Sequence, residues 1–498
     1  MLEGWPSGRR RTTGNRVGCK SPRGFESHPF RHFFPLAVLG ACALLIIAFA
    51  PAQYFGRQQD DLLYFLGARS LLSGSYCLLT SPGCPPLTMI NPGWPMILAP
   101  LAALSENPAL FAAFSAIILA ACPIALWAWL RRRSDETTAL LAAGIFASCP
   151  LVLAQSGVVM SEAPYLLVLL ALLAAVESGR PAAAGSLAAV LLLLRTAGLS
   201  ALPALLIGPL RDRRWRALAL TAVPPATSYG LWSAWSWSKI GAVDKAQLVV
   251  TTYGANHWHK FLGVLTSNTQ YYLSEWGGCF LPPGQAAGPL ALALGAVLAA
   301  TAAWGLARAL HRRADDPAAW VLLGACAMHA VWGWQYERYM IPLLPLLLWA
   351  MSTALERYAR PALAVLLGLQ LTMQTLPRLG KQSPWAEPEL HETYAWLAAR
   401  PRPALMSSAL FARDGWLSGL PSLPLPEEPD AAAFAADLKA WRVGFVMHAD
   451  GLDIGLHDDP TSSLRQHVER SGSYLSDERL FKKVYENARE RTSVYEPR

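Results

Sequence analysis

The chain has 498 residues, of which 53% are hydrophobic and 15% are charged, and its formal net charge is +8. Soluble domains carry about 25% charged residues, so this composition excludes an ordinary soluble protein and indicates a membrane protein. The positive charge does not indicate nucleic-acid binding, because the arginine clusters lie between apolar runs, where the preference for basic residues on the cytoplasmic side explains them.

The first 32 residues are basic and polar and have no apolar core of their own. Two interpretations fit them, a disordered tail or a stretch of genome that is not translated. We favour the second, since Gly24 to Ser27 can be encoded by a sequence that contains the T-arm signature of a tRNA gene. The fold prediction therefore excludes residues 1–32.

Apolar runs then recur at intervals that fit a bilayer, which takes about 20 apolar residues per helix. They lie at about 33–52, 108–130, 137–153, 164–176, 181–194, 199–210, 217–237, 286–307, 317–334, 340–355 and 361–376. The sequence thus predicts an all-α polytopic membrane domain over residues 33–377, with about 11 transmembrane helices. Residues 378–498 are polar, with mixed helix and strand patterns, and predict a small α/β domain that includes a buried strand at 441–447.

Alternating sides from a cytoplasmic N-terminus would place most arginine-rich connections on one face of the membrane. These connections are Arg131–Arg133, Glu177–Arg180, Arg211–Arg216, Arg308–Arg313 and Glu356–Arg360. The opposite face would then carry the first loop (residues 53–107), a later aromatic loop (residues 238–284) and the C-terminal domain. We therefore expect an integral multi-pass protein of the inner (plasma) membrane, with these three regions outside the cytoplasm.

The first loop carries two adjacent acids, Asp60 and Asp61, shortly after the first apolar run. Acids held at a membrane surface are costly and usually serve a function. A carboxylate there can accept the proton of an attacking hydroxyl or amine, or bind a metal ion. The alternative is a solvated helix end, and position alone does not decide between them. The apolar spacing of residues 60–72 predicts a helix along the membrane surface.

Three more charged residues are candidates, each with a plain structural alternative. Glu162 could join Asp61 in a divalent-cation site, since such ions take several oxygen ligands, although the helix dipole also favours an acid at a helix start. Arg195 and Arg338 could each clamp a lipid phosphate. Snorkelling of Arg195 to the interface, or a solvated pair of Arg338 with Glu337, would explain them equally well.

The eight cysteines show no metal-ligand spacing. Cys77 and Cys84 share the first loop, and a disulfide between them is plausible if that loop lies outside the cytoplasm. His257 and His259 could bind a metal ion or act in acid–base steps, but a plain loop explains them better.

Together these residues resemble the GT-C glycosyltransferases that use polyprenyl-phosphate sugars, a class that includes the protein O-mannosyltransferases and the aminoarabinose transferases that modify lipid A. The resemblance covers about residues 33–376. It rests on the acidic pair, Tyr64, Ala68-Arg69-Ser70-Leu71-Leu72, Gly74, Tyr76, Asn91-Pro92-Gly93-Trp94-Pro95, Ser161-Glu162, and Arg338-Tyr339 followed by Pro342 and Pro345. Asn91 and Trp94 stand where the family carries proline and tyrosine.

The resemblance implies inverting transfer. The acceptor attacks the anomeric carbon, a carboxylate takes its proton, and the polyprenyl phosphate leaves. By position, the resemblance makes Asp60 the first candidate for the essential aspartate and Asp61 the second. The family often carries Asp-Glu there, so the Asp-Asp of this chain leaves the assignment open. Arg195 or Arg338, with or without a divalent cation, would stabilise the phosphate charge.

The substrate-binding residues that the resemblance implies are Tyr64, Arg69, Arg195, Arg338 and Tyr339. The expected partners are a polyprenyl-phosphate-linked sugar, the membrane, and an acceptor that is a lipid, a glycan or a protein. The sugar itself cannot be read from the sequence. A transporter or flippase, a polymerase or ligase of lipid-linked glycans, and an assembly protein remain alternatives. A transporter would be expected to show inverted repeats and mid-membrane charges, neither of which is evident.

Overall fold

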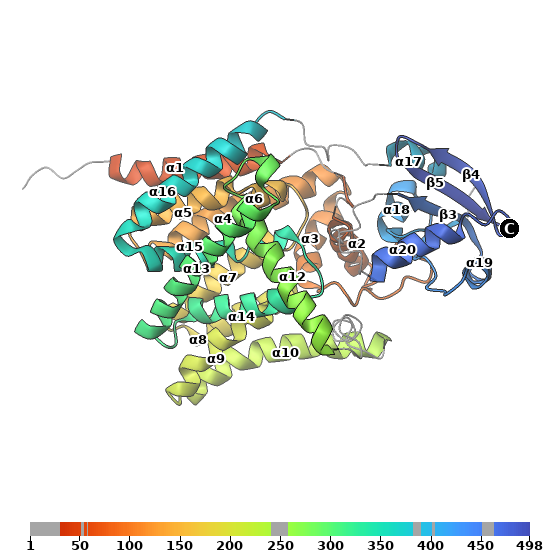
Figure 1. The fold of residues 1–498 in the computed structure, drawn as a ribbon. Helices are drawn as coiled ribbons and strands as arrows, with labels where there is room; N and C mark the ends of the chain where they lie inside the picture. The colour runs from red at the N-terminus through yellow and green to blue at the C-terminus, as the bar shows by residue number, and fades with distance from the viewer. Residues whose placement is uncertain are drawn as a thin grey trace, which may run out of the picture.

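The computed structural model describes residues 30–50, 54–56, 58–240, 257–381, 390–400, 404–450 and 463–498. They form a large helical domain and a smaller C-terminal domain beside one end of it (Figure 1). The helices of the large domain are α1 (Phe30–Ala48), α2 (Asp60–Leu72), α3 (Gly93–Leu104), α4 (Pro108–Leu130), α5 (Glu136–Ser148), α6 (Pro150–Ala154), α7 (Glu162–Glu177), α8 (Pro181–Leu194), η1 (Thr196–Ala201), α9 (Leu202–Arg211), α10 (Trp215–Ile240), α12 (His257–Gly278), η2 (Pro283–Gln285), α13 (Pro289–Arg312), α14 (Pro317–Val331), η3 (Glu337–Met340), α15 (Leu344–Leu355), η4 (Glu356–Tyr358), α16 (Ala359–Gln370), η5 (Leu371–Thr375) and η6 (Leu376–Arg378).

Local sequence explains where several of these helices begin. The Asn107 side chain accepts a hydrogen bond from the Ala109 amide at 3.0 Å, and Pro108 takes the first position of α4. Asp316 caps the start of α14 in the same way. Short polar side chains satisfy the free amides of a helix start, where proline sacrifices no hydrogen bond. The predicted helices over 60–72 and 108–130 are confirmed at both ends, as α2 and α4.

One predicted helix is divided in the structure. The segment predicted as a single helix over 137–153 consists of α5 and α6, because Cys149 has an extended backbone (ψ 128°) and Pro150 begins a new helix. The break leaves the short α6 next to η3, the element that carries Arg338.

The predicted loop over 238–284 contains a helix of 22 residues, α12. The polar side chains of this segment predicted a loop. One of them, however, packs against the neighbouring helix and holds α12 in place. The Asn268 amide group donates to the carbonyls of His329 and Trp332 at 2.9 and 2.7 Å. α12 is thereby bound to the segment that leads from α14 to η3.

Two helices among the described residues, α4 and α13, are long and apolar enough to cross a membrane by length and composition. Shorter apolar helices occur at 33–48, 93–104, 136–148, 181–194 and 317–331. The number of about 11 transmembrane helices therefore stays a prediction.

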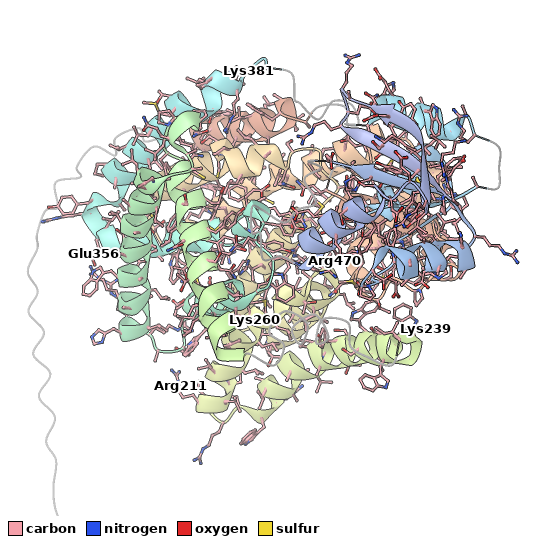
Figure 2. All side chains as sticks on the ribbon, turned by 45° about the vertical axis from the view of Figure 1, so that its right-hand side comes forward. Arg211, Lys239, Lys260, Glu356, Lys381 and Arg470 are labelled. Carbon is pink, nitrogen blue, oxygen red and sulfur yellow. A yellow bond between two sulfur atoms is a disulfide. The ribbon has the colours of Figure 1, made fainter. Side chains whose placement is uncertain are left out.

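The charged connections that were predicted to share one face do lie together, because ion pairs join them. These pairs are Arg133 with Glu177 and Asp316, Arg211 with Asp315, Arg308 and Arg312 with Glu356, and Arg360 with Asp135. Figure 2 shows Arg211 and Glu356 on the side of the helical domain that is turned away from the C-terminal domain. The arrangement agrees with the predicted sidedness, while the compartment that each face meets stays a prediction.

The C-terminal domain is a five-stranded mixed sheet with flanking helices, in the order β2-β1-β3-β5-β4. Its elements are α17 (His391–Ala398), β1 (Leu405–Ser407), α18 (Phe411–Ser418), β2 (Ser422–Leu423), α19 (Ala431–Ala440), β3 (Val443–Ala449), α20 (Ser463–Tyr474), β4 (Phe481–Asn487) and β5 (Thr492–Pro497). Strand β1 pairs in parallel with β2 and β3, and β5 pairs antiparallel with β3 and β4. The predicted small α/β domain and its buried strand, now the central β3, are confirmed.

Candidate functional site

A cavity of about 440 Å³ lies between the helical domain and the C-terminal domain. Its polar lining includes Asp60, Tyr64, Glu162, Arg195 and Tyr339. Its apolar lining includes Leu169 of α7, Val321 and Ala325 of α14, Leu346 of α15, and Leu343 directly before α15. From the C-terminal domain it is lined by Ala409, Leu410, Phe411, Pro424, Leu425, Glu427, His467 and Val468. The cavity therefore joins a charged region to an apolar one.

Asp61 is not part of the cavity lining, and its side chain holds the start of α2. Its carboxylate is 2% exposed. It accepts hydrogen bonds from the backbone amides of Gly56, Gln58 and Leu62 at 3.1, 3.2 and 2.9 Å. Burial raises the pKa of Asp61 to about 6, although the three hydrogen bonds act to lower it. Asp61 thus fixes the turn that presents its neighbour, Asp60.

Backbone strain marks the same turn. Gln59, directly before Asp60, has a φ of +56°, a conformation that non-glycine residues rarely adopt. Strain of this kind persists only where surrounding contacts impose it, and it is frequent at functional sites. Here the hydrogen bonds to Asp61 supply the constraint.

Asp60 faces the cavity and is paired with Arg338. The Asp60 side chain is 36% exposed, and its Oδ2 lies 2.7 Å from Arg338 Nη2. Arg338 also donates through Nη1 to Gln58 Oε1 at 2.5 Å. The arginine thereby holds both the carboxylate and the residue two positions before it. The pair with Arg338 uses Oδ2, and Asp60 also lines the cavity, where its Oδ1 can meet a ligand.

Glu162 joins the two arginines. Its side chain is 2% exposed, and its Oε1 lies 2.7 Å from Arg195 Nη1 and 3.3 Å from Arg338 Nε. The two guanidinium groups and the carboxylates of Asp60 and Glu162 balance in formal charge. Burial lowers the pKa of each arginine, but the neighbouring acids raise it more, so both guanidinium groups stay protonated.

The two arginines differ in their access to the cavity. Arg195 is among the residues that line it, whereas Arg338 is 3% exposed and lies behind Asp60 and Glu162. Arg195 also donates to Ser161 Oγ at 2.9 Å, and the Tyr64 hydroxyl lies 2.8 Å from the same oxygen. Burial raises the pKa of Tyr64, which keeps its hydroxyl protonated. Arg195 is therefore the better placed of the two to meet an anionic ligand.

Both arginines lie over aromatic rings. The guanidinium carbon of Arg195 is 5.3 Å from the centroid of the Tyr339 ring, and that of Arg338 is 4.1 Å from the centroid of the Tyr336 ring. Such contacts stabilise a cation in a site with little water. The Tyr339 ring thus helps to orient Arg195.

The predicted metal ligands do not fit a cation site. Both oxygens of Asp61 accept hydrogen bonds from backbone amides, and Glu162 faces two guanidinium groups. Across the described part of the chain, no group of three or more His, Cys, Asp and Glu side chains could hold a metal ion. The side chains of His257 and His259 lie outside the described residues. We derive no step through a metal ion.

The remaining candidates lie away from the cavity. Arg69 forms a surface ion pair with Glu106, because it is on the face of α2 that is turned from the cavity. Cys77 and Cys84 are joined in a disulfide, with their Cα atoms 5.2 Å apart.

Two residues of the site were missed at the level of sequence. Gln58 contacts Arg338, and its position beside the acidic pair was the only available signal. Asn91 was named only as a replacement for a proline of the family, but its side chain donates to the Leu192 carbonyl at 2.7 Å. That bond attaches the start of α3 to the end of α8, just before Arg195.

No protein-family model matches the chain, and no curated protein matches it by sequence. Solved structures match it by fold. ArnT from Cupriavidus metallidurans bound to undecaprenyl phosphate has a TM-score of 0.57 at 12% identity, over 92% of this chain and 97% of that chain. The oligosaccharyltransferase AglB from Archaeoglobus fulgidus, in complex with an inhibitory peptide and a dolichol-phosphate, has a TM-score of 0.52 at 13% identity, over 85% and 70%. Both are GT-C glycosyltransferases, and the expected GT-C fold is confirmed.

Proposed function

We propose that this protein is an integral membrane glycosyltransferase. It transfers a sugar from a polyprenyl-phosphate donor to an acceptor on the extracytoplasmic face of the inner membrane. The observation that carries the proposal is that Asp60 and Arg195 line the same cavity, so that a proton acceptor and a phosphate-binding cation meet in one site. The shared fold supports it, since the matched ArnT and AglB structures contain undecaprenyl phosphate and dolichol-phosphate.

The donor fits the division of the cavity. Leu169, Val321 and Leu346 give the apolar region that a prenyl chain requires. Arg195, at the polar end, can bind the phosphate through two parallel hydrogen bonds. The sugar then lies towards Asp60 and the C-terminal domain.

In the reaction, a hydroxyl or amine of the acceptor attacks the anomeric carbon of the sugar. Asp60 accepts the proton through Oδ1, the oxygen that Arg338 does not hold, and the bond to the phosphate oxygen breaks. The released phosphate carries the charge, which Arg195 stabilises where it develops. Attack from the face opposite the leaving phosphate inverts the anomeric centre. Asp61 and Glu162 contact no reacting atom in this scheme, and act by holding Asp60 and Arg195 in place.

The test is sugar transfer by membranes that contain equal amounts of each variant, with radiolabelled polyprenyl-phosphate sugars as donors. Asp60→Asn should lower the rate about 10²- to 10⁴-fold, the usual contribution of a general base. Glu486→Gln, which changes an exposed acid of the C-terminal domain, should leave it unchanged. Wild-type rates in Asp60→Asn would remove Asp60 from the mechanism. No transfer from any donor, with donor binding intact, would favour a transporter of lipid-linked sugars.

A further inference from the structure

The C-terminal domain contacts the segment that carries the acidic pair. Figure 1 shows it beside α2 and α3, and α18 makes the contact. Ala412 of α18 is fully buried in the same apolar cluster as Phe55 and Phe65. The Trp416 ring lies edge-on to both, with centroid distances of 6.5 and 5.3 Å. This helix therefore belongs as much to the core around the first loop as to its own domain.

Arg413, on the same helix, covers the backbone at Gly56. Gly56 has a φ of +102°, and a Cβ atom there would lie 2.5 Å from Arg413 Cγ. Only glycine allows both this conformation and so close an approach. The aliphatic part of Arg413 thus packs directly on the Gly56 peptide.

The Gly56 peptide in turn holds Asp61. Its amide donates to Asp61 Oδ2 at 3.1 Å, and Asp61 Oδ1 accepts from the amide of Leu62 in the first turn of α2. A continuous series of contacts therefore runs from Arg413 through Gly56 and Asp61 to the turn that presents Asp60.

Arg413 is itself firmly held. It is 5% exposed, and its Nε lies 3.4 Å from Oδ1 of the buried Asp414. The same oxygen accepts a hydrogen bond from the Tyr394 hydroxyl of α17 at 2.7 Å. Buried ion pairs often add little net stability, and their best-supported role is to select one geometry. The arrangement fixes the direction in which Arg413 leaves α18.

We propose that Arg413 is a positioning residue for Asp60, acting through Gly56 and Asp61, so that the C-terminal domain completes the catalytic site. The inference rests on the proposed function, because Asp60 must be the proton acceptor for its placement to affect the rate. Displacing a catalytic group by about 1 Å can lower a rate about 10²-fold.

A second contact makes this proposal testable without detaching the domain. Ser81 of the first loop donates to the Ser422 carbonyl at 2.8 Å, and the Ser422 amide donates to the Thr80 carbonyl at 2.9 Å. These bonds, and the apolar contacts of Trp416, do not involve Arg413. The C-terminal domain should therefore stay docked when Arg413 is replaced.

The experiment compares Arg413→Gln, Arg413→Lys and Arg479→Gln in the full chain. Arg479 is the matched control, because it also pairs with an aspartate of the C-terminal domain, Asp477, but at the exposed surface. Two measurements are made on each protein: amide hydrogen exchange in peptides that cover residues 54–62, and transfer kinetics with the polyprenyl-phosphate sugar that the wild type uses.

In Arg413→Gln, exchange at 54–62 should rise about tenfold or more, and kcat should fall about tenfold or more with a donor KM within twofold of wild type. Arg413→Gln removes the charge that pairs with Asp414 and directs the side chain over Gly56, whereas Arg413→Lys keeps that charge and should recover most of both. Arg479→Gln should match wild type. Wild-type exchange and kcat in Arg413→Gln would overturn the proposal. So would raised exchange across the whole C-terminal domain, which would indicate general unfolding.

The two measurements separate this inference from the proposed function. If the wild type transfers no sugar, the proposed function fails, while raised exchange confined to 54–62 would still establish the coupling. If the wild type is active and both readouts are unchanged in Arg413→Gln, the coupling alone is wrong.

Discussion

Arg338 Nη2 lies 2.7 Å from Asp60 Oδ2, although the two residues are 278 positions apart in the sequence. The proposed proton acceptor is thus paired with a cation before any substrate binds. Asp60, Glu162, Arg195 and Arg338 form a group of two carboxylates and two guanidinium cations whose charges already balance. An anionic donor that binds Arg195 enters this group. Its phosphate adds negative charge, so we expect the pairing within this group to adjust when the donor binds.

The first prediction concerns Arg338. Arg338→Gln leaves Asp60 without its cation and Glu162 with only Arg195. Removing the partner of a buried charged group costs about 1–3 kcal/mol or more, so the variant should unfold at a lower temperature than the wild type in detergent. Transfer should fall together with stability.

The matched control is the double variant Arg338→Gln/Glu162→Gln, which removes one charge of each sign. It should recover part of the lost thermal stability and none of the transfer activity. A double variant as unstable as Arg338→Gln alone would show that the loss does not come from the unpaired acid.

The second prediction concerns Glu162 alone. Glu162→Gln gives the cluster an excess positive charge, because Arg195 loses its carboxylate partner while Arg338 keeps Asp60. The donor should bind more tightly, with a KM lowered several-fold. The rate should fall about tenfold or more, because Arg195 loses the carboxylate that holds it in place. Kinetics with a polyprenyl-phosphate sugar, and competition by free polyprenyl phosphate, would measure both effects.

Glu162→Asp keeps the charge and shortens the side chain, and serves as the control. It should retain the wild-type KM within about twofold. A raised KM in Glu162→Gln would contradict the charge argument, since it would show that the carboxylate itself helps to bind the donor.

The third prediction concerns pH. Burial raises the pKa of Asp61 to about 6, above its value in the unfolded chain. The protonated form is therefore favoured in the folded protein. The stability that this form contributes is fully present below about pH 4 and is lost as the pH rises through about 6, by about 3 kcal/mol at about 1.4 kcal/mol per pKa unit.

Other groups titrate in the same range, so the measured quantity is the difference in melting temperature between wild type and Asp61→Asn. Asparagine does not titrate, so the wild type should lose melting temperature relative to the variant between pH 4 and pH 6.5. A difference that stays constant over this range would mean that Asp61 does not titrate there.

Local patterns predicted the helix that carries Asp60 at both ends, because its signals lie within a few residues of one another. They could not show the pairing with Arg338, which depends on a contact between distant segments. They also could not decide which face of α2 meets the cavity. The family resemblance implied that Arg69 binds substrate, whereas the structure pairs it with Glu106 at the surface.

The sequence also carried no indication that the C-terminal domain contacts the first loop. In the sequence, Gly56 and Arg413 are an ordinary glycine and an ordinary arginine. Their significance comes from the docking of α18 on the first loop, which brings together residues from opposite ends of the chain. The same docking places Phe411 and Leu425 in the wall of the cavity.

The last prediction concerns the disulfide between Cys77 and Cys84, which closes the short segment that contains Thr80 and Ser81. A loop of this length should stabilise the folded state by about 2–3 kcal/mol through the restricted unfolded chain. Because Thr80 and Ser81 bind Ser422, the double variant Cys77→Ser/Cys84→Ser should also loosen the C-terminal domain. It should melt at a lower temperature and show faster exchange at both Ser81 and Ser422. Cys326→Ser, which changes an exposed free thiol, is the control and should match wild type. A lower melting temperature with unchanged exchange at Ser422 would confine the effect of the disulfide to the first loop.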